Sequence, residues 1–137
     1  MIRTLRTFAL IFALTSACLM ASCITKRVIH PTMFPALDFA WVQVREDVLR
    51  GIEDGRATEE LHAFEAAQLS SNVTHLGAAL AARDLPAMRQ APWETLRPWG
   101  KRGIEAQLEA GEIGPGVALS LHEQLYNFSE TWRRITE

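Results

Sequence analysis

Apolar residues recur at helical spacing along most of the chain after residue 36. The first run lies between Leu37 and Glu53, and its members follow one another at steps of three or four residues: Leu37, Trp41, Val44, Val48 and Ile52. This spacing places them on one side of an α-helix, which has about 3.6 residues per turn. Asp54 and Gly55 follow the run and are expected to end the helix.

A second helix is predicted to begin at Thr58, whose side chain can cap it, with Glu59 and Glu60 in the first turn. It extends to about Arg83, and the proline-containing segment 84–86 ends it. Its middle, residues 70–74, contains few good helix formers, so a break there is an alternative.

A third helix is predicted between Trp93 and Ala110, with Pro98 in or near its first turn. Gly111 follows directly. Glycine commonly adopts the left-handed backbone conformation that ends a helix, so Gly111 is expected to be the C-terminal cap.

The fourth predicted helix begins at Gly114-Pro115, because proline suits the first helical position. Its apolar residues form a narrow stripe along the whole length, which predicts burial from end to end: Val117, Leu121, Leu125, Phe128, Trp132 and Ile135. No sustained alternation typical of strands occurs, and no internal repeat is evident. The pattern therefore predicts an all-α fold, a small antiparallel bundle of about four helices.

The N-terminus has a different pattern. Arg3 and Arg6 precede an uncharged segment, residues 8–22, that ends in small residues. This is the layout of a secretory signal peptide. A membrane-spanning helix needs roughly 20 apolar residues, and this run has only about 15.

The residues Met20-Ala21-Ser22-Cys23 resemble the lipobox of bacterial lipoproteins. The resemblance implies that Cys23 receives a diacylglyceryl group, that a peptidase removes residues 1–22, and that the new amino group is acylated. Thr15-Ser16-Ala17-Cys18 is an alternative lipobox. The chain has no further cysteine, so a disulfide framework is not expected.

The resemblance also implies a location. Ile24 stands where an Asp usually retains a lipoprotein of Gram-negative bacteria in the inner membrane. We therefore expect an outer-membrane protein that faces the periplasm. The predicted organisation is a signal peptide at 1–22, an extended tether at 23–35 and a helical domain at 36–137.

The charge of the chain bears on its partners. Removal of residues 1–22 changes the formal charge from −2 to −4, because it removes Arg3 and Arg6. A mildly acidic protein without a basic patch is not expected to bind nucleic acid.

The motifs of the chain indicate no enzyme, metal or cofactor. Glu59 and His62 form one Glu-x-x-His, whereas a di-iron carboxylate bundle needs two. The chain also lacks a P-loop, a Gly-x-Ser-x-Gly and a Cys-x-x-Cys-His.

Three groups of residues are candidates for binding. Gln68, Asn72 and His75 share one face of the second predicted helix and could line a ligand cavity. Trp93 and Trp99 flank two prolines and could form a binding loop. The third pair is Leu119 and Tyr126, seven residues apart on the fourth helix and away from its apolar stripe.

Together these features predict a membrane-anchored envelope lipoprotein that acts as a non-enzymatic scaffold or adaptor for an envelope protein. The alternative is a periplasm-facing helical protein that binds a small apolar or metal ligand. An internal cavity lined by Gln68, Asn72 and His75 would favour the alternative.

Overall fold

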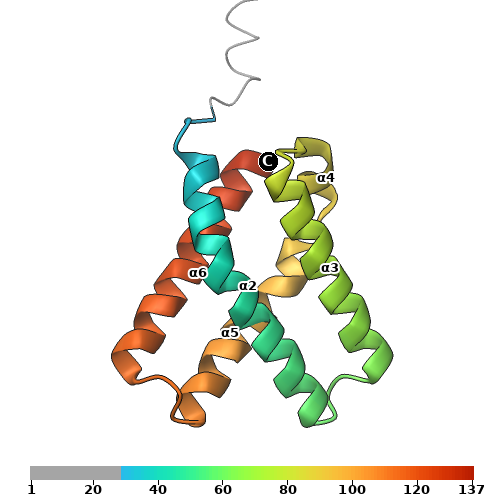
Figure 1. Ribbon diagram of the computed structural model, residues 1–137, viewed down its shortest axis with the longest axis vertical. Helices are drawn as coiled ribbons and strands as arrows, with labels where there is room; N and C mark the ends of the chain where they lie inside the picture. Colours follow the sequence, from blue (N-terminus) through green and yellow to red (C-terminus); the bar gives the residue numbers. More distant parts are fainter. Residues whose placement is uncertain (1–28) are drawn as a thin grey trace, which may run out of the picture. The chain divides into compact units, whose positions relative to one another are not determined.

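Five helices build the part of the chain that the computed structural model describes, residues 29–137. They are α2 (Met33–Ala57), α3 (Ala63–Ala81), α4 (Leu85–Gln90), α5 (Trp93–Glu109) and α6 (Pro115–Thr136) (Figure 1). No strand occurs between residues 29 and 137. The predicted all-α helical bundle is confirmed. Residues 31–137 form one compact unit.

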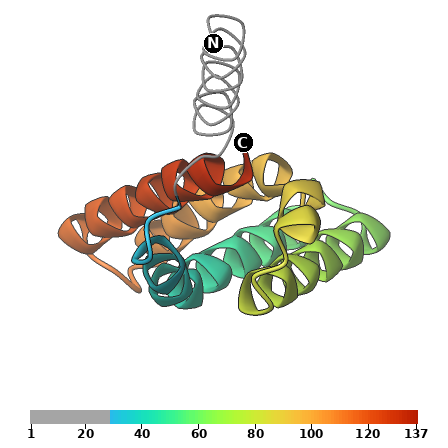
Figure 2. The same ribbon diagram turned by 90° about the horizontal axis from the view of Figure 1, so that it is seen from above.

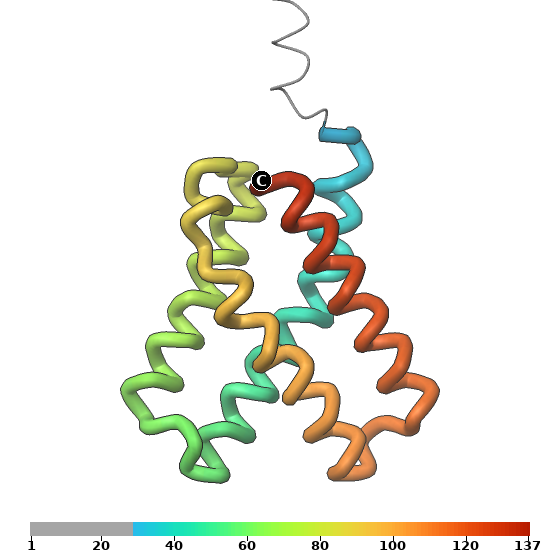
Figure 3. Tube along the Cα trace, turned by 180° about the vertical axis from the view of Figure 1, so that it is seen from behind, coloured from blue at the N-terminus to red at the C-terminus, as the bar shows by residue number. Residues whose placement is uncertain are grey.

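Two helical hairpins, α2–α3 and α5–α6, make up the bundle. The first helix of each hairpin crosses the first helix of the other near its middle, as the views from front and back show (Figures 1 and 3). Seen from above, one hairpin lies behind the other (Figure 2). The α2–α5 crossing is therefore the centre of the fold.

Gly51 on α2 and Gly103 on α5 bring the two backbones into direct contact at this crossing. A Cβ atom added to Gly51 would lie 1.8 Å from the carbonyl oxygen of Trp99, and one added to Gly103 would lie 1.7 Å from that of Asp47. No side chain fits in either space. The crossing can form only where both helices carry glycine.

An internal repeat relates the two hairpins, and the sequence analysis missed it. Residues 50–53 read Arg-Gly-Ile-Glu, and residues 102–105 read the same, 52 positions later. The same offset relates the ends of α2 and α5, Ala57 and Glu109, and the beginnings of α3 and α6, Ala63 and Pro115. Below, the counterpart of a residue is the one 52 positions away.

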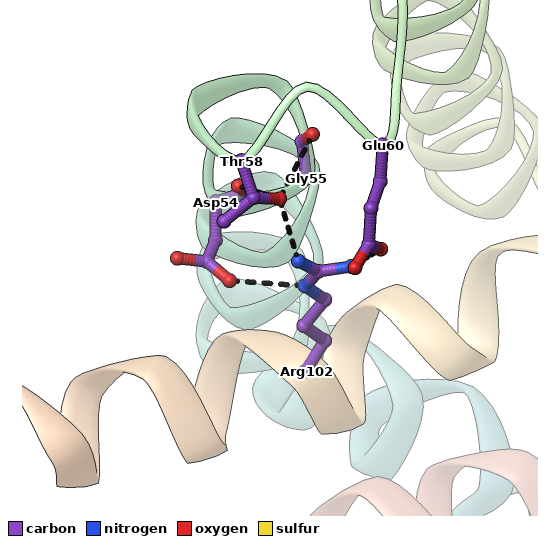
Figure 4. Close-up of polar contacts among 5 residues, drawn as sticks. All are labelled: Asp54, Gly55, Thr58, Glu60 and Arg102. Carbon is purple, nitrogen blue, oxygen red and sulfur yellow. Dashed lines mark hydrogen bonds and ion pairs between the residues drawn. The ribbon is translucent and has the colours of Figure 1, made fainter.

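Reciprocal ion pairs follow the repeat. Arg102 on α5 pairs with Glu60 after α2, and its counterpart Arg50 on α2 pairs with Glu112 after α5 at 2.7 Å. The Arg102 guanidinium also donates to Asp54 at 2.9 Å and to the Thr58 hydroxyl at 2.9 Å (Figure 4). Exposed pairs of this kind stabilise a fold only modestly, so they support the glycine contact rather than replace it.

Both hairpin turns have a residue with a positive φ at the same position of the repeat. Gly111 after α5 has a φ of 71°, as predicted for a C-terminal cap, and its N–H donates to the Leu108 carbonyl at 3.1 Å. Its counterpart Glu59 has a φ of 62°, which is uncommon for a residue with a side chain. The positive φ is therefore adopted once by glycine and once by a residue with a side chain.

Several predicted helix boundaries around the first hairpin turn were wrong. The helix continues through Asp54 and Gly55, and Thr58 is the C-terminal cap of α2, where its hydroxyl donates to the Asp54 carbonyl at 3.0 Å. The next helix begins at Ala63 and has no break at residues 70–74. At its other end α2 begins at Met33, three residues before the predicted domain boundary at 36, since Pro35 is tolerated in a first turn.

The short helix α4 was not predicted. Residues 33–57 form one continuous helix, but their counterparts, residues 85–109, are divided into α4 and α5 around Ala91 and Pro92. Pro92, the counterpart of Ala40, cannot donate a helical hydrogen bond and precedes the new helix as its N-cap. Asp84 caps α4, accepting from the Ala87 N–H at 3.2 Å.

The aromatic core lies where α2, α5 and α6 meet. The ring of Phe128 on α6 lies 4.8 Å from that of Trp93, 5.6 Å from that of Trp41 and 5.8 Å from that of Trp132. The predicted stripe on α6 is buried at its C-terminal end but not at its N-terminal end, where Val117 is 51% exposed and its neighbour Ala118 is buried. In the first turn of α6 the buried position is therefore Ala118, one residue after the predicted Val117.

Substitution Gly103→Ala should destabilise the protein by about 3 kcal/mol or more, because the new methyl group overlaps the α2 backbone. Gly116→Ala is the matched control: Gly116 lies in the first turn of α6 with no atom near its Cβ position. It should be neutral or stabilising by up to about 1 kcal/mol. Urea denaturation of both variants measures the difference. Equal stabilities would mean that the two helices do not touch at Gly103.

Candidate partner-binding surface

Leu119 and Tyr126 lie on the solvent side of α6, away from its buried stripe. Leu119 is 71% exposed and Tyr126 is 56% exposed. They are two helical turns apart and so share one side of the helix. This is the placement that the sequence predicted for them, although partner binding by the pair stays a prediction.

A groove of about 420 Å³ runs between α5 and α6 beside Tyr126. Its walls come from both helices of the hairpin: Glu94, Arg97, Pro98 and Lys101 from α5, and His122, Leu125 and Tyr126 from α6. The α5 residues fall on one face because they are spaced by three, four and seven positions. Sequence reasoning identified Tyr126 but not the α5 wall, since only the hairpin brings the two helices together.

The charge of this groove differs from that of its surroundings. Residues 31–137 carry a formal charge of −6, from 10 Lys and Arg against 16 Asp and Glu. In the groove, Arg97 lies 3.9 Å from Glu94, whereas Lys101 forms no ion pair within the described residues. Arg97 and Lys101 therefore outnumber the one acid of the lining, with His122 beside them.

The two tryptophans predicted as a binding loop differ in burial. Trp93 is 2% exposed and donates from its indole N–H to the Ser129 hydroxyl at 3.1 Å. The Trp93 ring is therefore covered within the bundle, and a partner-binding role for it stays a prediction. Trp99 is half-buried; it packs on Gly55, and the Arg102 guanidinium lies 5.5 Å from its ring centre.

The polar face of α3 points away from the core. Gln68 and His75 are exposed and Asn72 is half-buried, while Val73, Leu76 and Leu80 point inward. These three polar residues therefore lie on the outer side of α3, and ligand binding by them stays a prediction.

Their counterparts on α6 do line a groove. Ser120, Gln124 and Asn127, which the sequence analysis missed, form one wall of a groove of about 470 Å³ between α6 and the N-terminal half of α2. Recognition of the repeat would have pointed to them.

The residues considered for metal binding lie in the described part of the chain, unlike those considered for lipid attachment. No group of His, Cys, Asp and Glu within residues 29–137 could hold a metal ion. Glu59 and His62, the single Glu-x-x-His, are exposed. The cysteines proposed for lipid attachment, Cys23 and its alternative Cys18, lie outside the described residues.

Asp47 is the one fully buried carboxylate in the described part of the chain. Its Oδ1 accepts from the Gln43 amide at 3.0 Å and from the Gln107 amide at 3.1 Å, and its Oδ2 has no hydrogen-bond partner. Burial disfavours the charged form and raises the pKa of Asp47 above its ordinary value. Its counterpart is Trp99, so a carboxylate on one side of the crossing replaces an aromatic ring on the other.

Comparisons with protein-family models, with curated proteins and with solved structures gave no match. Among residues 29–137, none of the helices combines the length and the hydropathy that crossing a bilayer requires.

Substitution Asp47→Asn should leave the stability at pH 7 unchanged or raise it by up to roughly 3 kcal/mol, because it removes a buried charge and keeps an acceptor for both glutamines. The pKa of Asp47 is raised in the folded protein, so the wild type should gain stability relative to the variant as the pH falls from 7 toward 4.

Denaturant titrations at several pH values would measure this difference. Glu105→Gln, at an exposed position on α5, removes one negative charge and serves as control. A loss of stability in Asp47→Asn at pH 7 of more than about 1 kcal/mol would show that the ionised carboxylate supports the crossing.

Proposed function

We propose that this protein is a lipid-anchored envelope lipoprotein that acts as a non-enzymatic adaptor and holds a partner protein near the outer membrane, on its periplasmic side. The observation that carries the proposal is the order of features along the chain. A lipobox-like Met20-Ala21-Ser22-Cys23 is followed within ten residues by a helical domain that begins at Met33.

The chemistry of the anchor supports a permanent attachment. One acyl chain gives only reversible membrane binding, and two signals are needed for a stable one. A diacylglyceryl cysteine with an acylated amino group exceeds that requirement. Residues 24–32 between Cys23 and α2 could extend about 30 Å, so the domain would stay close to the lipid surface.

The exposed side of the α5–α6 hairpin supports the adaptor role. It combines two exposed apolar side chains, Leu119 and Tyr126, with the adjacent groove. A mixed apolar and polar surface of this kind is typical of protein interfaces. Holding the partner near a membrane raises its local concentration without any new contact.

Mass spectrometry of the mature N-terminal peptide tests the anchor. We expect the peptide to begin at an acylated Cys23, and we expect Cys23→Ser to abolish processing and membrane retention. Cys18→Ser, which changes the cysteine of the alternative lipobox, should be processed like the wild type. An unmodified chain that retains residues 1–22 would contradict the proposal, and an acylated Cys18 would move the attachment site.

A double substitution, Leu119→Ser with Tyr126→Ser, tests the partner-binding surface. Both side chains are exposed, so the melting temperature should barely change, while recovery of crosslinked partner from intact cells should fall several-fold. Val42→Ser with Phe64→Ser removes exposed apolar side chains from α2 and α3 and is the matched control. If recovery falls equally in both variants or in neither, recognition lies elsewhere on the domain.

A further inference from the structure

We infer that the α5–α6 groove binds an acidic amphipathic helix. In the cell this helix would belong to the partner protein, so the biological setting rests on the proposed adaptor function. The inference names the chemistry of that partner: carboxylates spaced by one helical turn, next to apolar side chains on the same face.

The two walls of the groove are suited to different parts of such a helix. Arg97 and Lys101 are one turn apart on α5, about 6 Å along the helix axis. Carboxylates at positions i and i+4 of a helix have the same spacing. Across the groove, His122 and Tyr126 are also one turn apart, and Tyr126 offers a half-exposed ring for an apolar side chain.

The charge balance favours an acidic occupant. Lys101 is the only lysine within residues 29–137, it is exposed, and it forms no ion pair in that range. Glu94, beside Arg97, is the one acid in the lining; outside it, Glu130 pairs with Arg133 at 3.0 Å, and the exposed Glu105 lies one turn beyond Lys101 without forming an ion pair with it. A net positive groove on a domain with a formal charge of −6 attracts and orients an acidic segment.

The repeat provides an internal comparison. The counterparts of Pro98, Lys101, His122 and Tyr126 in the α2–α3 hairpin are Glu46, Leu49, Ser70 and Thr74. Both hairpins have the same helical architecture, so the fold itself does not require a lysine, a histidine or an aromatic ring at these positions. Of the cationic and aromatic residues in the groove, only Arg97 has a similar counterpart, Arg45.

Other occupants fit less well. Negatively charged lipid headgroups would match the cations, but an acidic domain is repelled by an anionic bilayer. A peptide that binds by adding a strand needs the edge of a sheet, and residues 29–137 contain none. The apolar floor at Leu125 and the exposed Leu119 beyond the groove match a helix that carries an apolar stripe.

Fluorescence anisotropy with designed peptides tests the inference. The probe is an alanine-based helical peptide of about 15 residues, with two Glu four positions apart beside two Leu. A second peptide replaces both Glu by Lys. The protein is the full chain in a non-ionic detergent, compared as wild type, Lys101→Glu and Arg45→Glu. Both variants make the same change in net charge, but only Lys101 lies in the groove.

We expect the wild type to prefer the Glu peptide. Lys101→Glu should lower the affinity for the Glu peptide roughly 5-fold at low ionic strength and should raise the affinity for the Lys peptide. Arg45→Glu should change neither affinity by more than about 2-fold. Lys101→Gln should lower the affinity for the Glu peptide by less than Lys101→Glu does. Thermal melts check that each variant is folded.

Three results would overturn the inference: equal affinity of the wild type for both peptides, equal effects of Lys101→Glu and Arg45→Glu, or Lys101-dependent binding to phosphatidylglycerol vesicles without discrimination between the peptides. The measurement needs neither lipidation nor an envelope partner. If the peptides do not bind as expected, the adaptor proposal is not contradicted. If the chain carries no lipid, peptide binding in the groove is not contradicted.

Discussion

The contact between the backbones of Gly51 and Gly103 determines the arrangement of the other helices. Side chains normally keep two packed helices 8–10 Å apart. Here each glycine admits the carbonyl of the opposite helix, so α2 and α5 cross in direct backbone contact. Gly100 and Gly55 extend this close approach, because Val48 and Leu125 pack over the first and Trp99 over the second. The ion pairs of Arg50 and Arg102 then hold each hairpin turn against the other hairpin.

Helix periodicity predicted the secondary structure well where a helix buries one face along its length. The apolar spacing identified α2, α5 and most of α6, and Gly111 was a reliable end signal. The prediction failed where the same residue type occurs both at the end of a helix and inside or at the start of one. Asp54-Gly55 looked like the end of a helix. Gly55 instead lies inside α2, where its small size leaves room for the Trp99 ring of α5. Thr58 looked like an N-cap, but its hydroxyl serves the preceding helix.

For the candidate surface too, sequence alone predicted what depends on a single helix but not what depends on two helices packing together. The exposure of Leu119 and Tyr126 follows from the position of the buried stripe on one helix, so sequence sufficed. The groove depends on which residues of α5 face α6, and that requires the hairpin. The burial of Trp93 was not predicted, because proline and tryptophan are common both in binding loops and at the start of buried helices. The repeat escaped notice because Arg-Gly-Ile-Glu is its only run of consecutive identical residues, whereas Asp47 and Trp99, or Gly55 and Gln107, are chemically unrelated.

That chemical difference distinguishes correct from incorrect association of the hairpins. Two similar hairpins could in principle pair with their own kind in different molecules. In the observed pairing, Asp47 meets the Gln107 amide and Trp99 packs against Gly55. Two α2–α3 hairpins would instead place each Asp47 opposite a glycine, without that amide. Two α5–α6 hairpins would place each indole ring against a glutamine where only a glycine leaves room. Both homotypic dimers lose complementary contacts, so the repeat favours intramolecular pairing over exchange between chains.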